Sequence, residues 1–342
     1  MQTEFWVGAS TLGRIGSTAE GVRRLTVAVD GTLTLGDPIE VGANPMFLAW
    51  HRGVIGIVHE LPDGRVSVWL AEGEGLTPVA GPSPTGAAAP CHIEFSADGS
   101  KLFVANYAGG SVSLHNAGTA GLLGSVALHG SGPHQIRQLA SHPHQIVRDE
   151  RRRRILVPDL GSDRICAITV DPTDSRKLVH EASDDHLLHP GAGPRHLVVA
   201  GDLAVVANEL DRTVSIVDLV ESAEIRCVRI PGLRSKTSLG ISAIRRTAAG
   251  TVLVGDRATD AVHAFRFDER DRSLEHLVEL RTGGRYPRDL ELTHDERYLL
   301  VADQASDSIA VVEIDPMGVP STVVGTVPTP APACLMRLPV PE

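Results

Sequence analysis

Short apolar runs of strand length recur along this chain at a nearly constant spacing. Each run opens with a proline or, in one case, a leucine. The openers are Pro45, Pro90, Pro143, Pro194, Leu239, Pro287 and Pro332. By subtraction, successive openers lie 45, 53, 51, 45, 48 and 45 residues apart. A repeat of this length is typical of folds that use one supersecondary unit many times.

Each repeat contains further apolar runs in a fixed order. A second run follows each of the first six openers and ends in a small or polar pair. These pairs are His59-Glu60, Asn106-Tyr107, Asp159-Leu160, Asn208-Glu209, Asp256-Arg257 and Asp303-Gln304. A third run, such as Thr213–Val217, has the composition of a strand. Turn residues such as Ala97-Asp98-Gly99 separate the first two runs. About four strands in a repeat of roughly 45 residues indicate a propeller blade.

The two ends of the chain complement each other. Residues 5–9, 24–29 and 32–35 resemble the second, third and fourth strands of a repeat, and residues 332–338 supply the missing first strand. We therefore predict an all-β, seven-bladed β-propeller with four antiparallel strands per blade, the last blade being closed by the N- and C-terminal strands. Such closure leaves no unpaired strand edge in the ring. Residues 1–342 are predicted to form a single β-propeller domain, with inter-blade loops at 81–90 and 121–141.

Charge and composition exclude several classes of partner. The formal net charge of -10 argues against a nucleic-acid or anionic-membrane surface. The one basic run, Arg151–Arg154, falls where other repeats place their first turn, which predicts a solvated turn. The chain has no apolar run of membrane-spanning length and no secretory leader pattern. We expect a cytoplasmic protein, a monomer or weak homodimer, with no nucleic-acid or membrane partner.

The cysteines fit the same compartment. Cys91, Cys166, Cys227 and Cys334 show no CxxC spacing. Widely separated cysteines of this kind predict buried free thiols in a reducing environment.

The chemistry is expected at the mouth of the central channel, where equivalent positions of successive blades form rings. The ring just after the openers contains Met46, Cys91-His92, His144, Arg195-His196, Gly240, Arg288 and Ala333. The ring at the ends of the second strands contains Glu60, Tyr107, Leu160, Glu209, Arg257 and Gln304. A structural ring would repeat one residue type, whereas these rings are mixed and their polar members concentrate in blades 3 to 6. This distribution favours one off-centre site.

Three arginines are expected to converge on that site. Arg195, Arg257 and Arg288 would repel one another unless something anionic lay among them. A guanidinium has a planar fork that suits a carboxylate or a phosphate, so the three side chains indicate an anionic substrate. Pairing of each arginine with a nearby acid, such as Glu209 or Asp289, is the alternative.

His144 and Glu209 are the candidates for proton transfer. Histidine exchanges a proton near neutral pH. Glu209 would orient His144 or act as the acid and base itself, and a purely structural ion pair with Arg195 is the competing interpretation. The histidines between His129 and His144 lack the spacing of a metal site, and no GxSxG, dinucleotide or P-loop signature occurs. We therefore predict no catalytic metal.

Several of these stretches together resemble a known family. They are Pro90-Cys91-His92, Pro143-His144, Pro158–Gly161, Gly191–His196 with Asn208-Glu209, and Pro287-Arg288-Asp289. The chain resembles, over nearly its whole length, the seven-bladed β-propeller lactonases, whose best-known members are bacterial 6-phosphogluconolactonases. The family also includes fungal carboxymuconate-lactonising enzymes. Their site, thought to consist of a His, two Arg and a Glu, looks like His144, Arg195, Arg257 and Glu209.

The resemblance implies metal-independent hydrolysis of a sugar lactone without a cofactor, the expected substrate being 6-phosphogluconolactone or a related anionic lactone. His144 or Glu209 would be the base, and Arg257 or Arg195 would stabilise the oxyanion. Arg288 and another arginine would hold the phosphate. The other expected contacts with the substrate are Gln304, His196, Asp159, Tyr107 and Glu60.

Blades 5 and 1 depart from the family pattern. Blade 5 has Ser242–Arg246 where an acid or histidine is usual, and Ala248-Ala-Gly250 in place of an Asp-Gly turn. Blade 1 has His51-Arg52-Gly53 at the corresponding turn. The substrate is therefore less determined than the fold. Two alternatives remain open: a lactone-forming or isomerising enzyme of the muconate type, and a non-catalytic propeller scaffold.

Overall fold

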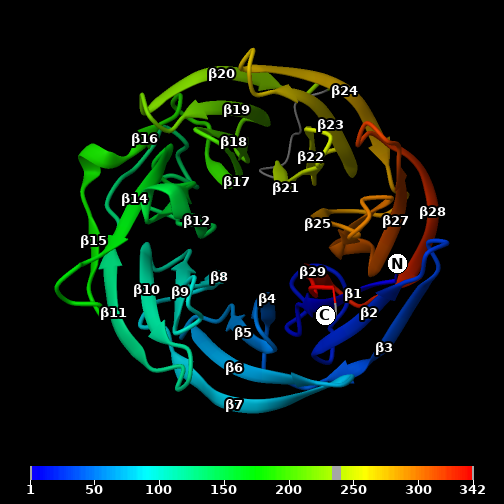
Figure 1. Cartoon of the computed structure of the whole chain (residues 1–342), viewed down its shortest axis with the longest axis horizontal. Helices are drawn as coiled ribbons and strands as arrows, with labels where there is room; N and C mark the ends of the chain where they lie inside the picture. The colour runs from blue at the N-terminus through cyan, green and yellow to red at the C-terminus, as the bar shows by residue number, and fades with distance from the viewer. Residues whose placement is uncertain (1, 233–239, 341–342) are drawn as a thin grey trace.

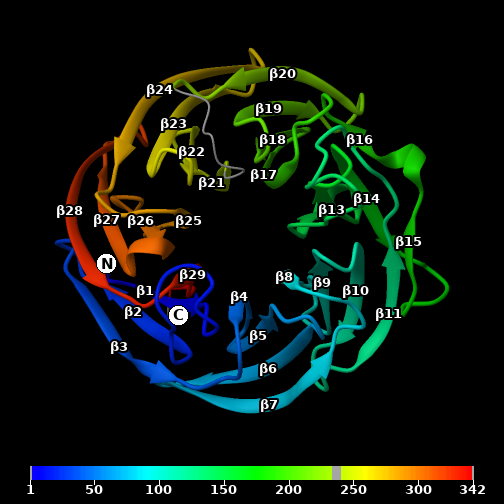
Figure 2. The ribbon, with the colours of Figure 1, turned by 180° about the vertical axis from the view of Figure 1, so that it is seen from behind.

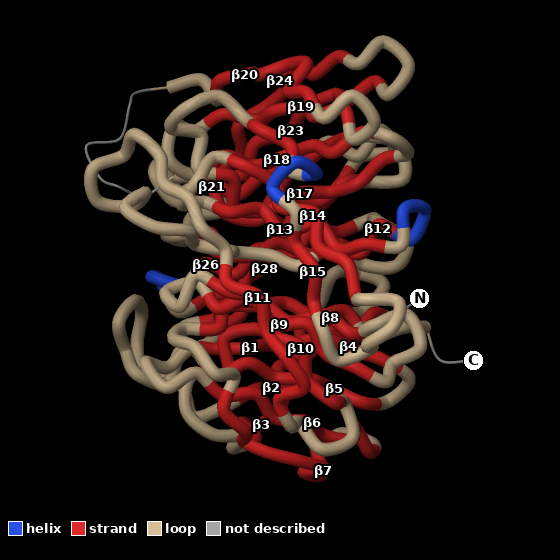
Figure 3. The backbone as a smooth tube through the Cα atoms, turned by 90° about the vertical axis from the view of Figure 1, so that its left-hand side faces the viewer, coloured by secondary structure: helices blue, strands red, loops and turns tan. Residues whose placement is uncertain are grey.

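A computed structural model describes residues 2–232 and 240–340 of the chain. Its strands are arranged in blades around one central axis (Figure 1), and the reverse view shows the same ring (Figure 2). Seen edge-on, the strands occupy the middle of the ring and the loops gather on its two faces (Figure 3). The predicted all-β, seven-bladed propeller is confirmed.

Five of the blades consist of four antiparallel strands in sequence order. Blade 1 contains β4 (Pro45–His51), β5 (Val54–His59), β6 (Arg65–Glu72) and β7 (Gly75–Pro84). Blade 2 contains β8 (Pro90–Phe95), β9 (Lys101–Asn106), β10 (Ser111–Asn116) and β11 (Leu122–Ala127). Blade 4 contains β17 (Pro194–Ala200), β18 (Leu203–Asn208), β19 (Thr213–Asp218) and β20 (Ala223–Arg229). Blade 5 contains β21 (Ile241–Arg246), β22 (Thr251–Asp256), β23 (Ala261–Asp268) and β24 (Ser273–Arg281). Blade 6 contains β25 (Pro287–Leu292), β26 (Tyr298–Asp303), β27 (Ser308–Ile314) and β28 (Pro320–Pro328).

Blade 7 is built from both ends of the chain. Its order is β29 (Pro332–Arg337), β1 (Thr3–Ala9), β2 (Val22–Val27) and β3 (Leu33–Ile39). β29 pairs antiparallel with β1, and Val7 lies opposite Leu335. Because both side chains are buried in one apolar cluster, the pairing closes the ring with core contacts as well as backbone hydrogen bonds. The predicted composite blade is confirmed.

Blade 3 departs from the four-strand plan because its outer strand is split. Its strands are β12 (Val147–Asp149), β13 (Arg154–Asp159), β14 (Arg164–Val170), β15 (Leu178–His180) and β16 (His186–Leu187). β15 and β16 both pair with β14, and β16 also forms a parallel bridge to β20 through Leu187 and Ala223. Blades 3 and 4 therefore belong to one continuous sheet.

Aliphatic side chains fill the junctions between blades. Each of the buried clusters contains residues of two neighbouring blades; one, for example, joins Val205 and Ile216 of blade 4 to Val254 and Phe265 of blade 5. Burying these surfaces stabilises the ring by roughly 25 cal/mol for each Å² of apolar area removed from water. The helices of the described part are three short 3-10 turns: η1 (Glu150–Arg152), η2 (Ala182–Asp184) and η3 (Gln304–Ser306). None of the described helices has the length or hydropathy needed to cross a bilayer.

Some local predictions were wrong. The ranges 81–90 and 121–141 are not loops throughout, because β7 extends to Pro84 and β11 occupies residues 122–127. Both are outermost strands with largely exposed residues, so the apolar alternation that marks a strand is weak there. Cys227 is exposed, whereas the other three cysteines are buried as predicted. The opener at Leu239 lies outside the described residues.

The basic run lies at the predicted turn but is tied to the protein. Arg151–Arg154 spans the connection between β12 and β13, with Arg153 in the left-handed conformation at a φ of 52°. Arg152 and Arg154 form ion pairs of 3.2 Å and 3.1 Å with Asp149. These local pairs agree with a turn rather than with a nucleic-acid site.

Candidate active site

The residue after the opener is set out of register in several blades. The pairing of the first two strands shifts at Met46, Cys91, Arg195 and Arg288. A bulge of this kind re-aims one side chain while the strand continues. In blade 3 the opener Pro143 forms only an isolated bridge with Asp159, and His144 donates its backbone N–H to the carbonyl of Pro158 at 2.9 Å. The first predicted ring therefore coincides with a repeated backbone irregularity.

Backbone hydrogen bonds hold the second predicted ring against the first. In six blades the residue that follows the second strand donates its N–H to a carbonyl next to the opener, directly before it in five blades and directly after Leu239 in blade 5. These bonds are Glu60 to Asn44, Tyr107 to Ala89, Leu160 to His142, Glu209 to Gly193, Arg257 to Gly240 and Gln304 to Tyr286, with lengths of 3.0, 2.9, 3.1, 2.7, 3.3 and 3.1 Å. The two rings thus lie together on one face of the propeller, which we call the charged mouth.

Glu209 is the centre of the charged mouth. Its carboxylate is 2% exposed. Oε1 accepts a hydrogen bond of 2.9 Å from Arg137, while Oε2 lies 2.7 Å from Nη2 of Arg257 and 3.1 Å from Nε of Arg195. Burial opposes ionisation, but the positive charges of Arg257, Arg137 and Arg195 outweigh it and lower the pKa of Glu209 to about 2. Glu209 is therefore a carboxylate at neutral pH and a very weak base.

The protein itself uses most of the donors of Arg257. Its Nε and Nη2 donate to the carbonyls of Gly240 and Ile241 at 3.1 Å and 3.2 Å, and its Nη1 donates to the Tyr286 hydroxyl at 3.1 Å. The Tyr286 ring also lies 5.1 Å from the guanidinium carbon. With Glu209 on Nη2 as well, little of the guanidinium is left for a ligand. These contacts favour a positioning role over the predicted contact with the oxyanion.

Arg195 is in the opposite situation. Its side chain is buried, yet its Nε and Nη1 have no hydrogen-bond partner among the described residues. Burial and the repulsion of Arg257 lower its pKa to about 9, against the attraction of Glu209. A buried guanidinium with unused N–H groups is costly unless an anion or a polar ligand completes its contacts. Arg195 is therefore the side chain best suited to bind a ligand.

Arg288 and Glu60 add a second ion pair at the charged mouth. Nη2 of Arg288 lies 3.5 Å from Oε2 of Glu60, and both side chains remain partly exposed. Arg288 also lies close enough to Arg195 to lower its pKa. The predicted ring residues and their partners bring four arginines and two glutamates together: Arg137, Arg195, Arg257, Arg288, Glu60 and Glu209. This excess of positive charge suits an anionic ligand.

His144 lies beside these arginines and carries no positive charge at neutral pH. It is buried, and its Nδ1 lies 3.9 Å from Sγ of Cys91. The Tyr107 ring meets it edge-on at 5.4 Å. Burial, followed by the charges of Arg195 and Arg288, lowers the pKa of His144 well below its usual range. A ligand anion would offset these two charges and make the imidazole more basic.

His196 lies deeper in the channel than predicted. Its ring centroid is 5.4 Å from that of His144 on one side and 5.9 Å from that of His92 on the other. With His92 it lines a cavity of about 450 Å³ that opens on the other face. Its Nδ1 has no hydrogen-bond partner among the described residues. His196 thus packs between the rings of His144 and His92, and its contacts do not place it among the arginines of the charged mouth.

Asp159 and Gln304, two predicted substrate contacts, differ in their surroundings. Asp159 binds its own loop, because it accepts hydrogen bonds from the backbone of His142 at 2.5 Å and Gly161 at 3.0 Å and from the Ser162 hydroxyl. Gln304 begins η3, and its buried Oε1 has no partner among the described residues. The bonds of Asp159 within its own loop do not favour the predicted contact with substrate, whereas the contact predicted for Gln304 stays a prediction.

Sequence analysis missed Arg137 and Tyr286. Arg137 lies in the connection between blades 2 and 3, and besides Glu209 it binds the Tyr107 hydroxyl at 3.0 Å. The unusual length of that connection was the available signal. Tyr286 precedes the opener Pro287 with a φ of 64°, a strained conformation for an aromatic residue that often accompanies a functional site. Repeat periodicity could not find either residue, because neither occupies a ring position.

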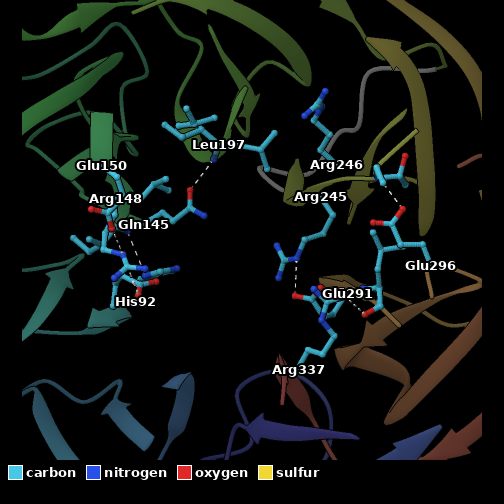
Figure 4. A pocket seen from close by; sticks show the side chains of 18 residues that line it. His92, Gln145, Arg148, Glu150, Leu197, Arg245, Arg246, Glu291, Glu296 and Arg337 are labelled. Carbon is cyan, nitrogen blue, oxygen red and sulfur yellow. Dashed lines mark hydrogen bonds and ion pairs between the residues drawn. The ribbon is translucent and has the colours of Figure 1, made fainter. Parts of the chain in front are cut away.

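The opposite face has its own cavity of about 710 Å³, shown in Figure 4. Its lining includes four arginines and four glutamates: Arg148, Arg245, Arg246, Arg337, Glu94, Glu150, Glu291 and Glu296. Arg245 is paired with Glu291 and Asp289, both at 3.0 Å, and Arg148 lies 3.3 Å from Glu150. The charges there balance within the protein, unlike those at the charged mouth.

Comparisons with known proteins agree with the fold. The family model described as "Lactonase, 7-bladed beta-propeller" matches residues 4–336. A 6-phosphogluconolactonase of Bacillus subtilis is 28% identical over 73% of this chain and 73% of its own length. A 6-phosphogluconolactonase of Erwinia tasmaniensis is 28% identical over 83% of this chain and 85% of its own length. The solved structure of a periplasmic gluconolactonase of Pseudomonas aeruginosa superposes over 100% of both chains with a TM-score of 0.90 and 23% identity.

Proposed function

This chain belongs to the family of seven-bladed β-propeller lactonases, and we propose that it hydrolyses an anionic sugar lactone at the charged mouth. The observation that carries the proposal is the buried Arg195, whose Nε and Nη1 have no hydrogen-bond partner among the described residues. The relatives named 6-phosphogluconolactonase make the phosphorylated lactone the preferred substrate. The predicted cytoplasmic location and oligomeric state remain predictions.

Hydrolysis needs a base to activate water and positive charge where the carbonyl oxygen becomes negative. Glu209 is a poor base because three arginines lower its pKa to about 2. His144 is neutral, and because its Nδ1 lies 3.9 Å from Sγ of Cys91, we assign Nε2 as the nitrogen that takes the proton. Sequence alone left these two residues as alternatives, and their surroundings favour His144 as the base.

The reaction then proceeds in two steps, addition of water and opening of the lactone ring. His144 takes a proton from water as the water oxygen bonds to the lactone carbonyl carbon, and the N–H groups of Arg195 bind the resulting oxyanion. When the carbonyl re-forms, the ring C–O bond breaks and His144 returns its proton to the departing alkoxide. The product is the open-chain hydroxy acid, whose carboxylic acid group then loses its proton to water. Arg257 and Arg137 take no part in bond making, since they hold Glu209 beside Arg195.

Arg288 is the arginine that would bind the phosphate. It is partly exposed, and its one ion pair within residues 2–232 and 240–340 is the 3.5 Å contact with Glu60. A phosphate would compete for it as a stronger, doubly charged partner. Binding of that anion would also offset the repulsion between Arg288 and Arg195 and raise the pKa of His144 towards its usual range.

The test compares 6-phosphogluconolactone with unphosphorylated gluconolactone as substrates of the purified protein. We expect hydrolysis of both and a kcat/KM at least about 10-fold higher for the phosphorylated lactone, because one charge-assisted contact contributes about 1.5–3 kcal/mol. Activity should survive exhaustive chelation. Equal kcat/KM values would remove the phosphate from the proposal. Failure to hydrolyse any lactone, together with turnover of a muconate, would favour the lactone-forming alternative.

A further inference from the structure

Three metal-ligand groups of different chemistry meet at the junction of blades 3 and 4, and none of them is a residue of the charged mouth. His189 lies in the loop after β16, and Glu224 and Cys227 lie on β20. One ligand atom of each residue lies within 4.8 Å of those of the other two. His189 and Glu224 are half-buried and Cys227 is exposed, so an ion can reach the cluster from solvent.

The imidazole of His189 is oriented as a metal ligand would be. Its Nδ1 lies 2.8 Å from Oε1 of Glu224, inside the cluster. Its Nε2 lies 2.9 Å from Oδ2 of Asp211, on the other side of the ring. A carboxylate that accepts the N–H of one ring nitrogen leaves the lone pair on the other, and this arrangement commonly supports metal-bound histidine.

The carboxylate of Glu224 is also held in place. The Ser215 hydroxyl donates to Oε1 at 2.5 Å, and the backbone N–H of His189 donates to Oε2 at 2.9 Å. Each carboxylate oxygen has two lone pairs, so these bonds orient the group and still leave it able to coordinate. His189 and Glu224 are therefore held by Asp211, Ser215 and a backbone amide before any ion arrives.

We propose that His189, Glu224 and Cys227 bind a zinc-like divalent ion at the junction of blades 3 and 4. Imidazole, carboxylate and thiolate are the ligands of protein zinc sites, and the thiolate selects against magnesium and calcium. The ion replaces the proton held between Nδ1 and Glu224, while the Cys227 thiol loses its proton to solvent. Two anionic ligands and a neutral imidazole balance the charge of the ion, and water completes the coordination.

A second cluster, Cys166 with His180 and Asp185, provides a contrast. There Asp185 accepts from His180 at 2.9 Å and lies 3.3 Å from Nη1 of Arg164, a fixed positive charge beside the carboxylate. Cys166 is fully buried. At the proposed site the arginine contact goes to Asp211, which is not a ligand: Arg229 lies 3.9 Å from its carboxylate. The second cluster therefore serves as a control.

Metal binding at this position would join two blades whose outer strands share little pairing. The bridge between β16 and β20 consists of the single pair Leu187 and Ala223. His189 belongs to the loop from blade 3, whereas its two fellow ligands belong to blade 4. Bound metal would therefore act as a cross-link. It would raise the free energy of unfolding, and the increase would grow with the ratio of free metal concentration to Kd. This inference does not depend on the proposed lactone hydrolysis.

Cobalt(II) is a suitable probe, because a cysteine thiolate on cobalt gives a charge-transfer band in the near ultraviolet. The full-length protein is first dialysed against a chelator. We then expect the intensity of this band to increase with added cobalt until one equivalent is bound, and excess zinc to abolish the band. Cys227→Ser should remove the band, whereas the matched variant Cys166→Ser should keep it. Asp211→Asn should keep the band and weaken binding about 10- to 100-fold.

Thermal unfolding provides a readout independent of cobalt. Zinc should raise the Tm of the wild type and of Cys166→Ser but not that of Cys227→Ser, which is safe to make because Cys227 is exposed. A titration without the charge-transfer band at one equivalent would overturn the proposal. So would a band that persists in Cys227→Ser, or one that disappears in Cys166→Ser.

Discussion

Nε of Arg195 lies 3.1 Å from Oε2 of Glu209, and yet neither Nε nor Nη1 of Arg195 has a hydrogen-bond partner among the described residues. The carboxylate attracts the guanidinium electrostatically but does not accept a hydrogen bond from its Nε or Nη1. Glu209 is more fully engaged, because Arg137 and Arg257 bind it as well. The pair thus divides its roles: Glu209 holds the arginines together, and Arg195 keeps donors for a ligand.

Arg195 and Arg257 should respond differently to replacement by alanine. Arg195→Ala should lower kcat/KM on every lactone by roughly 10- to 150-fold, the value of one charge-assisted contact, with little loss of stability because a poorly satisfied buried charge is removed. Arg257→Ala should destabilise the fold by about 3–5 kcal/mol, because it breaks a buried ion pair. Steady-state kinetics and urea unfolding measure the two effects. The reverse pattern would mean that Arg257 is the ligand-binding arginine.

Arg288→Ala should affect only the phosphorylated substrate. We expect KM for 6-phosphogluconolactone to rise roughly 10- to 150-fold, with kinetics on gluconolactone nearly unchanged, because the lost contact is with the phosphate. Arg281→Ala, at an exposed arginine on β24, is the control for a general loss of positive charge. A KM that rises equally on both lactones would remove Arg288 from phosphate binding.

The pH dependence should identify His144 as the base. The base must be neutral, so activity rises with pH through its pKa. In the free enzyme this pKa is lowered by burial and by Arg195 and Arg288. The acidic limb of the profile of kcat/KM against pH should therefore lie well below the usual range of histidine pKa values. The bound phosphate offsets the two arginines, so the limb of kcat should lie at higher pH. His144→Gln should abolish both limbs with most of the activity, and unshifted limbs in that variant would exclude His144 as the base.

Glu209 should contribute to the acid sensitivity of the fold. Its pKa in the folded protein, about 2, is lower than the value of 4.5 for an unperturbed glutamate. The stabilisation is therefore present above about pH 5 and is lost as the pH falls towards 2; by linkage it is on the order of a few kcal/mol. Glu209→Gln should be less stable at pH 7 and lose less stability on acidification. Glu74→Gln, on an exposed turn, should retain the wild-type slope.

Removal of residues 331–342 should open the ring. The deletion takes away β29, whose Cys334 and Leu335 are buried against neighbouring strands, and leaves β1 as an unpaired edge. We expect a lower Tm and self-association in analytical ultracentrifugation. A shorter deletion of residues 339–342 leaves β29 intact and should behave as the wild type. A monomeric 331–342 deletion with unchanged Tm would contradict closure by the terminal strands.

The sequence by itself determined the architecture and the ring positions. Apolar runs recur because each blade needs the same buried strands, so the openers from Pro45 to Pro332 could be read directly and the composite blade followed from what each end lacked. The same periodicity placed Arg195, Glu209 and Arg257 at equivalent positions of neighbouring blades. Equivalent positions in a closed ring must lie on one face, and the backbone bonds of Glu209 and Arg257 show that they do.

Only the tertiary structure decided what each of these residues does. Arg195 and Arg257 look alike in sequence, but the donors of Arg257 are used by Tyr286 and two carbonyls whereas those of Arg195 are not. Arg137 escaped the sequence pattern because it reaches Glu209 from an irregular connection that no repeat encodes. Periodicity specifies the backbone position of a residue within its blade. Its partners, its burial and therefore its pKa depend on which distant segments fold against it.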